Sequence, residues 1–325
     1  MRYFETHHAR RICVAPMMDC TDRHCRYFHR KLSRHVYLYT EMVTSRALLF
    51  GNIARHLSIM PEENPIALQL GGSDPGELAR CAKLAECWGY DEVNLNCGCP
   101  SERVQRGAFG ASLMKEATLV ANCVQAICDR VTIPITVKHR IGVDEIDNYE
   151  FVRDFVGTVA QGGCRVFIVH ARNAMLHGLS PKENREIPEL KYDYAYRLKR
   201  DFSEFEIIIN GGIKTLHEAH EHLHYVDGVM IGREFYHNPF LLADVDKFFY
   251  NPSAVVRTRS EVEQEMIEYI CAEYARGIHI SAITRHILGL YRNQPGARKW
   301  RRALSDPQKL STGILHTFDK AYASH

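Results

Sequence analysis

The chain has 325 residues, of which 46% are hydrophobic and 25% charged, and its formal net charge is +2. This balance is typical of a soluble globular protein, and the overall charge alone does not indicate a polyanionic partner. No apolar run approaches the ~20 residues that a membrane-spanning helix needs, so we expect no contact with a membrane.

The first eleven residues, MRYFETHHARR, are basic, but no apolar segment follows them, so we do not expect a secretory signal peptide. Eleven cysteines are scattered along the chain, and none of them forms a C-x-x-C pair. This pattern favours reduced, mostly buried thiols and argues against a metal site. We therefore expect a cytoplasmic protein without a bound metal.

Eight short aliphatic or β-branched runs alternate with segments of helical periodicity. The runs span residues 11–17, 35–42, 65–71, 91–98, 134–140, 164–171, 206–212 and 228–232. A helix is predicted over residues 74–89, for example, where Asp74 can cap the first turn. Eight such units predict an α/β fold, a TIM (β/α)8 barrel, whereas the alternative of an open doubly wound sheet usually has fewer strands.

Residues 253–325 contain helical patterns and no strand-like run, so we expect a barrel domain over residues 1–252 and a small all-helical domain after it. The second domain has 11 Lys and Arg against 7 Asp and Glu. Within residues 285–310, seven basic residues and one acidic residue accompany Tyr291 and Trp300. Such a run is often only solvated surface, but basic residues among aromatic ones also indicate contact with a phosphate backbone.

Glycines follow the last two predicted strands, in Asn210-Gly211-Gly212 and in Gly232-Arg233. Glycine lets the backbone approach a ligand and aim its N–H groups at it. Loops after strands 7 and 8 of TIM barrels commonly bind a phosphate, and an arginine adds a second donor. The pattern therefore favours a phosphate site over two plain turns.

Three polar residues, Gln69, Lys138 and His170, lie near the ends of predicted apolar strands. A flavin needs a positive group near its pyrimidine edge and hydrogen-bonding groups along its rim, which Lys138 and Gln69 could provide. His170 is open to two interpretations, a site residue or a core histidine bonded to a carbonyl.

Two cysteines lie one residue apart in the stretch NLNCGCPSERVQRGAFGASLM, residues 94–114. Strand alternation places Cys97 on the aliphatic face, which predicts that it packs in the interior. Cys99 follows the strand and precedes Pro100, so we expect it on a loop that Gly107 and Gly110 allow to move. A thiol with a pKa of ~8.5 is mostly protonated at neutral pH, so Cys99 is the candidate proton donor.

The chain resembles the tRNA-dihydrouridine synthases, and within them the A-type enzymes. The resemblance rests on ordered stretches between about residues 12 and 303: APMMDCTDRHCR, PIALQLGGSDP, NLNCGCPSERVQRGAFGASLM, ITVKHRIGVD, HARNAMLHGLSPKENREIP, INGGIKT, GVMIGREFYHNP and GARKWRR. One departure is Cys97, because family members usually carry an aliphatic residue there.

The resemblance implies a TIM barrel with tightly bound FMN, NADPH as the reductant, and a C-terminal helical domain that binds tRNA. It implies hydride transfer from reduced FMN to C6 of a D-loop uridine at position 20 or 20a, with Cys99 protonating C5. The implied cofactor contacts are Pro16, Met17, Met18, Gln69, Lys138, His170, Asn210, Gly211, Gly212, Gly232 and Arg233. The implied tRNA contacts are Asn96, Lys182, Arg185, Arg298 and Arg301.

Two other functions are weighed against this one. A flavin barrel acting on a free pyrimidine would not need a basic appended domain. A non-catalytic tRNA-binding protein would not need the predicted flavin residues. We therefore expect a flavin-dependent oxidoreductase that modifies tRNA as a monomer.

Overall fold

The computed structural model describes residues 10–305 of the chain. The described residues belong to two compact units, one formed by the segment up to Met18 together with Tyr37–Ile231, and the other by Asp19–Val36 and the segment from Gly232 onward. The division into a barrel domain of residues 1–252 and a helical domain of residues 253–325 stays a prediction. Residues 306–310 of the predicted basic stretch lie outside the described residues.

The first unit is built on eight parallel strands in the order β1-β8-β7-β6-β5-β4-β3-β2. They are β1 (Ile12–Val14), β2 (Leu38–Thr44), β3 (Ile66–Gly71), β4 (Glu92–Cys97), β5 (Ile135–Arg140), β6 (Val166–His170), β7 (Glu206–Asn210) and β8 (Gly228–Ile231). Tyr37 joins the two end strands, because its N–H donates to the Ile12 carbonyl and its carbonyl accepts from the Val14 N–H, both at 2.9 Å. The predicted TIM barrel is confirmed, and the open sheet is excluded.

All eight predicted strands are present, and β1 and β2 differ most from the predicted ranges, whereas the other six differ by one or two residues at an end. The first predicted strand ran to Met17, whereas β1 ends at Val14. Pro16 explains the early end, because proline has no N–H to donate to a neighbouring strand. β2 begins three residues later than predicted, and its register against β3 shifts between Tyr39 and Met42.

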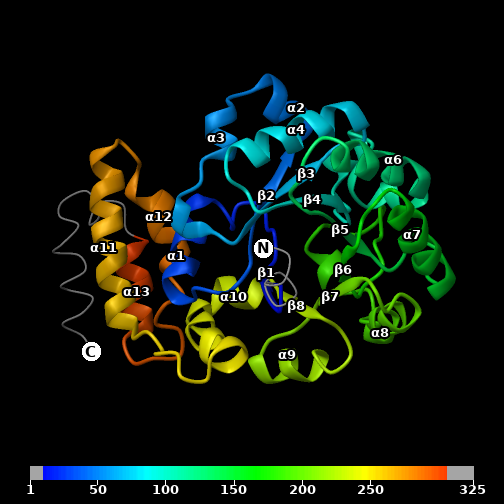
Figure 1. Cartoon of the computed structure of the whole chain (residues 1–325). Coiled ribbons are helices and arrows are strands. Elements are labelled where there is room, and N and C mark those ends of the chain that lie inside the picture. Colours follow the sequence, from blue (N-terminus) through cyan, green and yellow to red (C-terminus); the bar gives the residue numbers. More distant parts are fainter. Residues whose placement is uncertain (1–9, 306–325) are drawn as a thin grey trace. The chain divides into compact units, whose positions relative to one another are not determined.

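Helices of the first unit lie on the outside of the strands (Figure 1). They are α2 (Ser45–Phe50), α3 (Ile53–Leu57), η2 (Pro61–Glu63), α4 (Pro75–Cys87), α5 (Glu102–Arg106), η3 (Gly110–Lys115), α6 (Ala117–Cys128), α7 (Tyr149–Gln161), η4 (Glu183–Arg185), α8 (Tyr192–Asp201) and α9 (Leu216–His222). Asp74 caps α4 as predicted, since its carboxylate accepts the Glu77 N–H at 2.7 Å.

The second unit contains helices and connecting loops, with no strand among its described residues. It contains α1 (Arg23–Leu32), α10 (Arg233–His237), η5 (Pro239–Asp244), η6 (Asp246–Tyr250), α11 (Arg259–Ala275), α12 (Ile280–Ile287) and α13 (Ala297–Leu304). Trp300 anchors α13, because its indole N–H donates to the Ile287 carbonyl at 3.1 Å and its ring packs 4.8 Å from that of Tyr291. A helical C-terminal region is therefore confirmed. Within residues 10–305, no helix is both long and apolar enough to cross a membrane.

Candidate active site

The carboxyl ends of the barrel strands bring together most of the polar residues predicted to form the site. Strand pairing aligns Asn96 of β4 with Lys138 of β5, and His170 of β6 with Asn210 of β7. Because parallel strands direct their carboxyl ends to one face of a barrel, side chains far apart in the sequence meet there.

A chain of hydrogen bonds runs along the inside of the barrel, and we call it the polar column. The Asn96 amide donates to Gln69 Oε1 at 2.9 Å, and Gln69 Nε2 donates to Asn94 Oδ1 at 2.7 Å. Asn94 Nδ2 then donates to the Thr136 hydroxyl at 2.8 Å, and that hydroxyl donates to the Glu92 carboxylate at 2.5 Å. Gln69 is 1% exposed, so these partners fix the orientation of its amide.

Lys138 is a half-buried cation near the end of β5. Its Nζ donates to Asn210 Oδ1 at 3.2 Å, and no carboxylate pairs with it within residues 10–305. Burial, and to a smaller extent the Arg140 guanidinium, lower the pKa of Lys138 to about 7. A desolvated ammonium without an acidic partner is stabilised by an electron-rich or anionic ligand, so this site fits the pyrimidine edge of a flavin.

The His170 imidazole is 9% exposed. Burial lowers its pKa well below the usual range, and the cationic Arg140 and Lys138 lower it further. His170 is therefore neutral at physiological pH, so it adds a hydrogen-bonding group to the site without adding positive charge.

Backbone hydrogen bonds hold the loop that carries Cys99. The Cys99 N–H donates to Asn96 Oδ1, and its carbonyl accepts from the Ala111 N–H, both at 2.9 Å. Gly110 has φ +75°, and a Cβ there would lie 2.6 Å from the Cys99 carbonyl oxygen, so only glycine fits. The half-buried thiol lies 3.5 Å from the Ser101 hydroxyl. It is also close enough to Lys138 to raise the pKa of that side chain.

The neighbouring Cys97 is in a different environment. It is 0% exposed, and burial raises the pKa of its thiol well above the usual range. Cys97 ends β4 opposite His139 of β5. A fully buried, protonated thiol cannot reach a substrate, which supports the choice of Cys99 as the reactive cysteine.

Gly211 and Gly212 form a backbone turn directly after β7, with φ values of +123° and +73°. Their N–H groups donate to no acceptor within residues 10–305. A Cβ on Gly211 would lie 2.9 Å from His170 Cδ2, and one on Gly212 would lie 2.6 Å from Leu190 Cδ1. Two unused N–H groups in a turn restricted to glycine fit an anionic group such as a phosphate.

The other predicted cofactor residues lie beyond β1 and β8. Pro16 and Met17 are half-buried, whereas Met18 is 56% exposed. Gly232 caps α10, and Arg233 is the first residue of that helix, in the second unit.

The loop between β6 and α8 carries Lys182 and Arg185, both exposed. Asn184 between them is 0% exposed, and its side chain accepts the Met175 N–H at 2.8 Å and donates to the Met175 carbonyl at 2.9 Å. Arg185 is near enough to lower the pKa of His170, so the loop extends to the mouth of the barrel.

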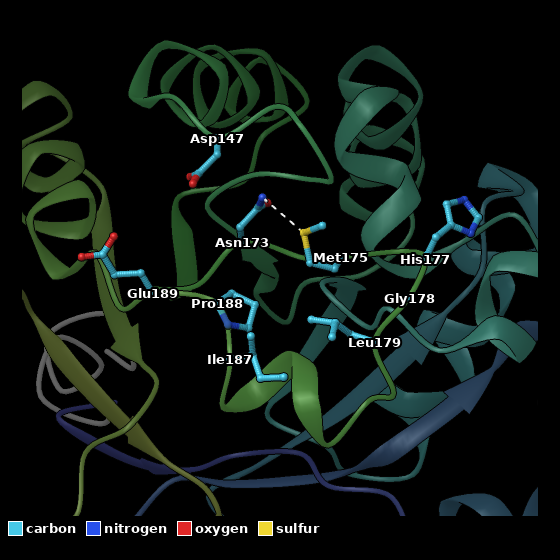
Figure 2. A pocket seen from close by; sticks show the side chains of 9 residues that line it. All are labelled: Asp147, Asn173, Met175, His177, Gly178, Leu179, Ile187, Pro188 and Glu189. Carbon is cyan, nitrogen blue, oxygen red and sulfur yellow. Dashed lines mark hydrogen bonds between the residues drawn. The ribbon is translucent and has the colours of Figure 1, made fainter.

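Two clefts are lined by residues of this loop. One of about 450 Å³ is lined by Asp147, Asn173, Met175, His177, Gly178, Leu179, Ile187, Pro188 and Glu189. Figure 2 shows Asp147 and Glu189 on one side of it and His177 on the other. The other, of about 800 Å³, lies between this loop and α5 and includes Pro100, the residue after Cys99. The Gln105 amide ties its two walls together, because it donates to the Pro100 and Leu176 carbonyls, each at 2.8 Å.

Arg298 and Arg301 lie on α13 in the second unit, and both are exposed. Trp300 and Leu304 form the buried side of this helix. Neither arginine pairs with a carboxylate within residues 10–305, so α13 presents uncompensated positive charge.

The predicted site did not include Arg140, Asn94 or Thr136. Arg140 had a detectable signal, because it lies two residues after Lys138 and so shares its face of the strand. Asn94 and Thr136 could not be recognised without the pairing of β4 with β5. Among residues 10–305, no group of three or more His, Cys, Asp or Glu side chains is arranged to hold a metal ion.

The family model described as "Dihydrouridine synthase (Dus)" matches residues 13–324. The chain is 57% identical over 300 residues to the tRNA-dihydrouridine(20/20a) synthase of Vibrio parahaemolyticus, covering 92% of each chain. It is 56% identical over 303 residues to the protein of the same name from Escherichia coli, covering 93% of this chain and 88% of the other.

Proposed function

Because the chain belongs to the dihydrouridine synthase family, we propose that it reduces uridines at positions 20 and 20a in the D-loop of tRNA to 5,6-dihydrouridine. Membership confirms the resemblance seen in the motifs and the expectation of an enzyme. Enzymes of this family depend on a flavin, which agrees with the cation Lys138 near the end of β5, with which no carboxylate of residues 10–305 pairs.

The observation that carries the proposal is Lys138, a half-buried cation near Cys99 with no acidic partner among the described residues. Lys138, Gln69 and His170 would hold the flavin ring and ribityl chain of FMN. FMN reduced by NADPH would supply the hydride for C6 of the uracil ring. The Lys138 ammonium would stabilise negative charge on the ring.

We assign the remaining FMN contacts to the strand ends on either side. Gly211 and Gly212, next to Asn210, would donate their unused N–H groups to the phosphate. The family resemblance also assigns Gly232 and Arg233 to phosphate binding. Pro16, Met17 and Met18 would line the flavin through their backbone.

Cys99 would donate its thiol proton to C5 of uracil from the side opposite the flavin. Asn96 supports this role, because its Oδ1 accepts the N–H groups of Gly98 and Cys99 at 3.0 and 2.9 Å. One further N–H of the Asn96 amide would be available to the target base. The base must leave its stack to reach the barrel, as it does in other enzymes that act on bases.

Exposed cations would hold the tRNA backbone. Lys182 and Arg185 lie on the loop next to the cleft that includes Pro100, and Arg298 and Arg301 lie on α13. Recognition of this kind depends on phosphate contacts and shape more than on base reading. We also propose that the enzyme acts in the cytoplasm as a monomer.

The test uses the purified full-length chain with FMN and NADPH. An unmodified tRNA transcript with a D-loop uridine is compared with free uridine, and dihydrouridine is mapped by mass spectrometry. We expect dihydrouridine at positions 20 and 20a of the transcript and none from free uridine. Reduction of free uridine at a similar rate would favour a pyrimidine-reducing enzyme, and unmodified tRNA in every assay would refute the proposal.

A further inference from the structure

Arg140 is the last residue of β5, and it is 3% exposed. Its guanidinium donates to three carbonyls, those of Gly98 at 3.2 Å, Asn173 at 3.1 Å and Asn184 at 2.9 Å. These carbonyls belong to two loops that are far apart in the chain, one after β4 and the other after β6. Within residues 10–305, no carboxylate pairs with Arg140.

The Gly98 carbonyl lies directly before the Cys99 amide in the chain. Asn96 and Ala111 already hold the N–H and the carbonyl of Cys99, as described above. Arg140 therefore holds the carbonyl end of the same peptide group whose N–H bonds Asn96, so this peptide is fixed at both ends. The orientation of this peptide plane sets the backbone angles of Cys99, and the direction of the thiol depends on those angles.

The second loop is organised around Asn184, whose side chain bonds the backbone of Met175. Arg140 holds the backbone of the same asparagine through its carbonyl. Lys182 lies two residues before Asn184, and Arg185 directly follows it. Arg140 thus joins the loop of the predicted tRNA contacts to the Cys99 loop, in addition to the link that Gln105 makes between Pro100 and Leu176.

Burying a guanidinium without a carboxylate is costly, so its hydrogen bonds must be well made. Burial lowers the pKa of Arg140 to about 9, and Arg185 and Arg172 contribute to that lowering, so the group stays charged at neutral pH. A planar fork of five N–H donors can reach carbonyls on two loops, whereas a lysine ammonium is a single point donor on a flexible stem.

We propose that Arg140 is a positioning residue that fixes the Cys99 loop to the loop of Lys182 and Arg185, and so aims the thiol at the substrate. This role rests on the proposed function of Cys99. Arg140 itself donates no proton, and it acts only through the peptide groups that it holds.

The test compares Arg140→Lys with Arg165→Lys in the full-length protein. Arg165 is a matched control, because its guanidinium also donates to backbone carbonyls, those of Ala160 at 2.7 Å and Cys164 at 2.8 Å. It precedes β6 and therefore lies at the opposite end of the barrel strands. Both substitutions keep the positive charge and remove the fork.

The first readout is the rate at which iodoacetamide alkylates Cys99, located by tandem mass spectrometry, with buried Cys97 in the same peptide as an internal standard. The second readout separates kcat from KM on unmodified tRNA. For Arg140→Lys we expect alkylation of Cys99 to rise about fivefold and kcat to fall at least about tenfold. FMN affinity and KM should change less than about threefold, and Arg165→Lys should leave both readouts unchanged.

Unchanged alkylation of Cys99, an unchanged kcat, or the same changes in Arg165→Lys would each overturn the proposal. Should Arg140→Lys fail to fold, hydrogen exchange on the unaltered protein decides instead. We expect residues 98–106 and 173–186 to lose protection at one common rate, and independent rates would refute the link between the loops. Alkylation and exchange do not require dihydrouridine formation, so a failure of the proposed function would be seen separately.

Discussion

The lowered pKa of Lys138 predicts that flavin binding weakens as the pH rises above 7. In the unliganded protein the ammonium loses its proton near pH 7. A flavin favours the charged form, so the pKa in the complex must be higher than in the free protein. The affinity for the flavin is therefore highest below pH 7. It falls as the pH rises from the pKa of Lys138 in the free protein to its pKa in the complex. From pH 6 to pH 8 we expect the Kd to rise about tenfold, which corresponds to ~1.4 kcal/mol.

Quenching of flavin fluorescence on binding measures this Kd. Riboflavin is the ligand of choice, because it lacks the phosphate, which has a pKa of its own near 6. Lys138→Met should bind weakly with no dependence on pH over this range, and Cys99→Ala should keep the wild-type slope. His170 stays neutral and Arg140 stays mostly charged between pH 6 and 8, so neither produces the slope. A flat wild-type profile, or an equal slope in Lys138→Met, would refute the reasoning.

Three further predictions concern other parts of the site. Cys99→Ala should keep FMN and tRNA binding but lose most dihydrouridine formation, while Cys97→Ala stays near wild type; equal losses in the mass-spectrometric assay would contradict this. Arg298→Ala and Arg301→Ala should each weaken tRNA binding and reduce the salt slope by about one unit, and an unchanged slope would mean that these side chains face only water. Gly211→Ala should lower FMN affinity at least about tenfold, since strain at φ +123° costs on the order of 1–3 kcal/mol, and a Kd unchanged in titration would show that the turn does not bind the cofactor.

The strands were predictable because buried parallel strands are short, nearly continuous aliphatic runs. The end of β1 was harder to predict, because the effect of Pro16 depends on whether a neighbouring strand needs an N–H donor at that position. The burial of Cys97 followed from alternation alone, since β4 is regular up to that residue.

Contacts between different strands and loops could not be predicted from the sequence. Asn94 looks like an ordinary polar residue until β3 and β5 place Gln69 and Thr136 on either side of it. Arg140 binds only backbone carbonyls, and such acceptors are present at every residue. The sequence could therefore indicate which polar residues lie near the mouth, but not which of them hold the loops in place.

The polar column has a direction, because every donor in it points toward Glu92. At its floor, Glu92 also accepts a bond from Arg10 at 2.6 Å, and Arg10 in turn contacts Glu206 at 3.1 Å. Neither the amide of Asn94 nor that of Gln69 can rotate by half a turn without setting oxygen against oxygen. Hydrogen bonds thus connect the mouth of the barrel to its base. A neutral substitution at Glu92 should therefore change the binding of the cofactor, whereas a substitution of an aliphatic residue in the same barrel should have only a local effect.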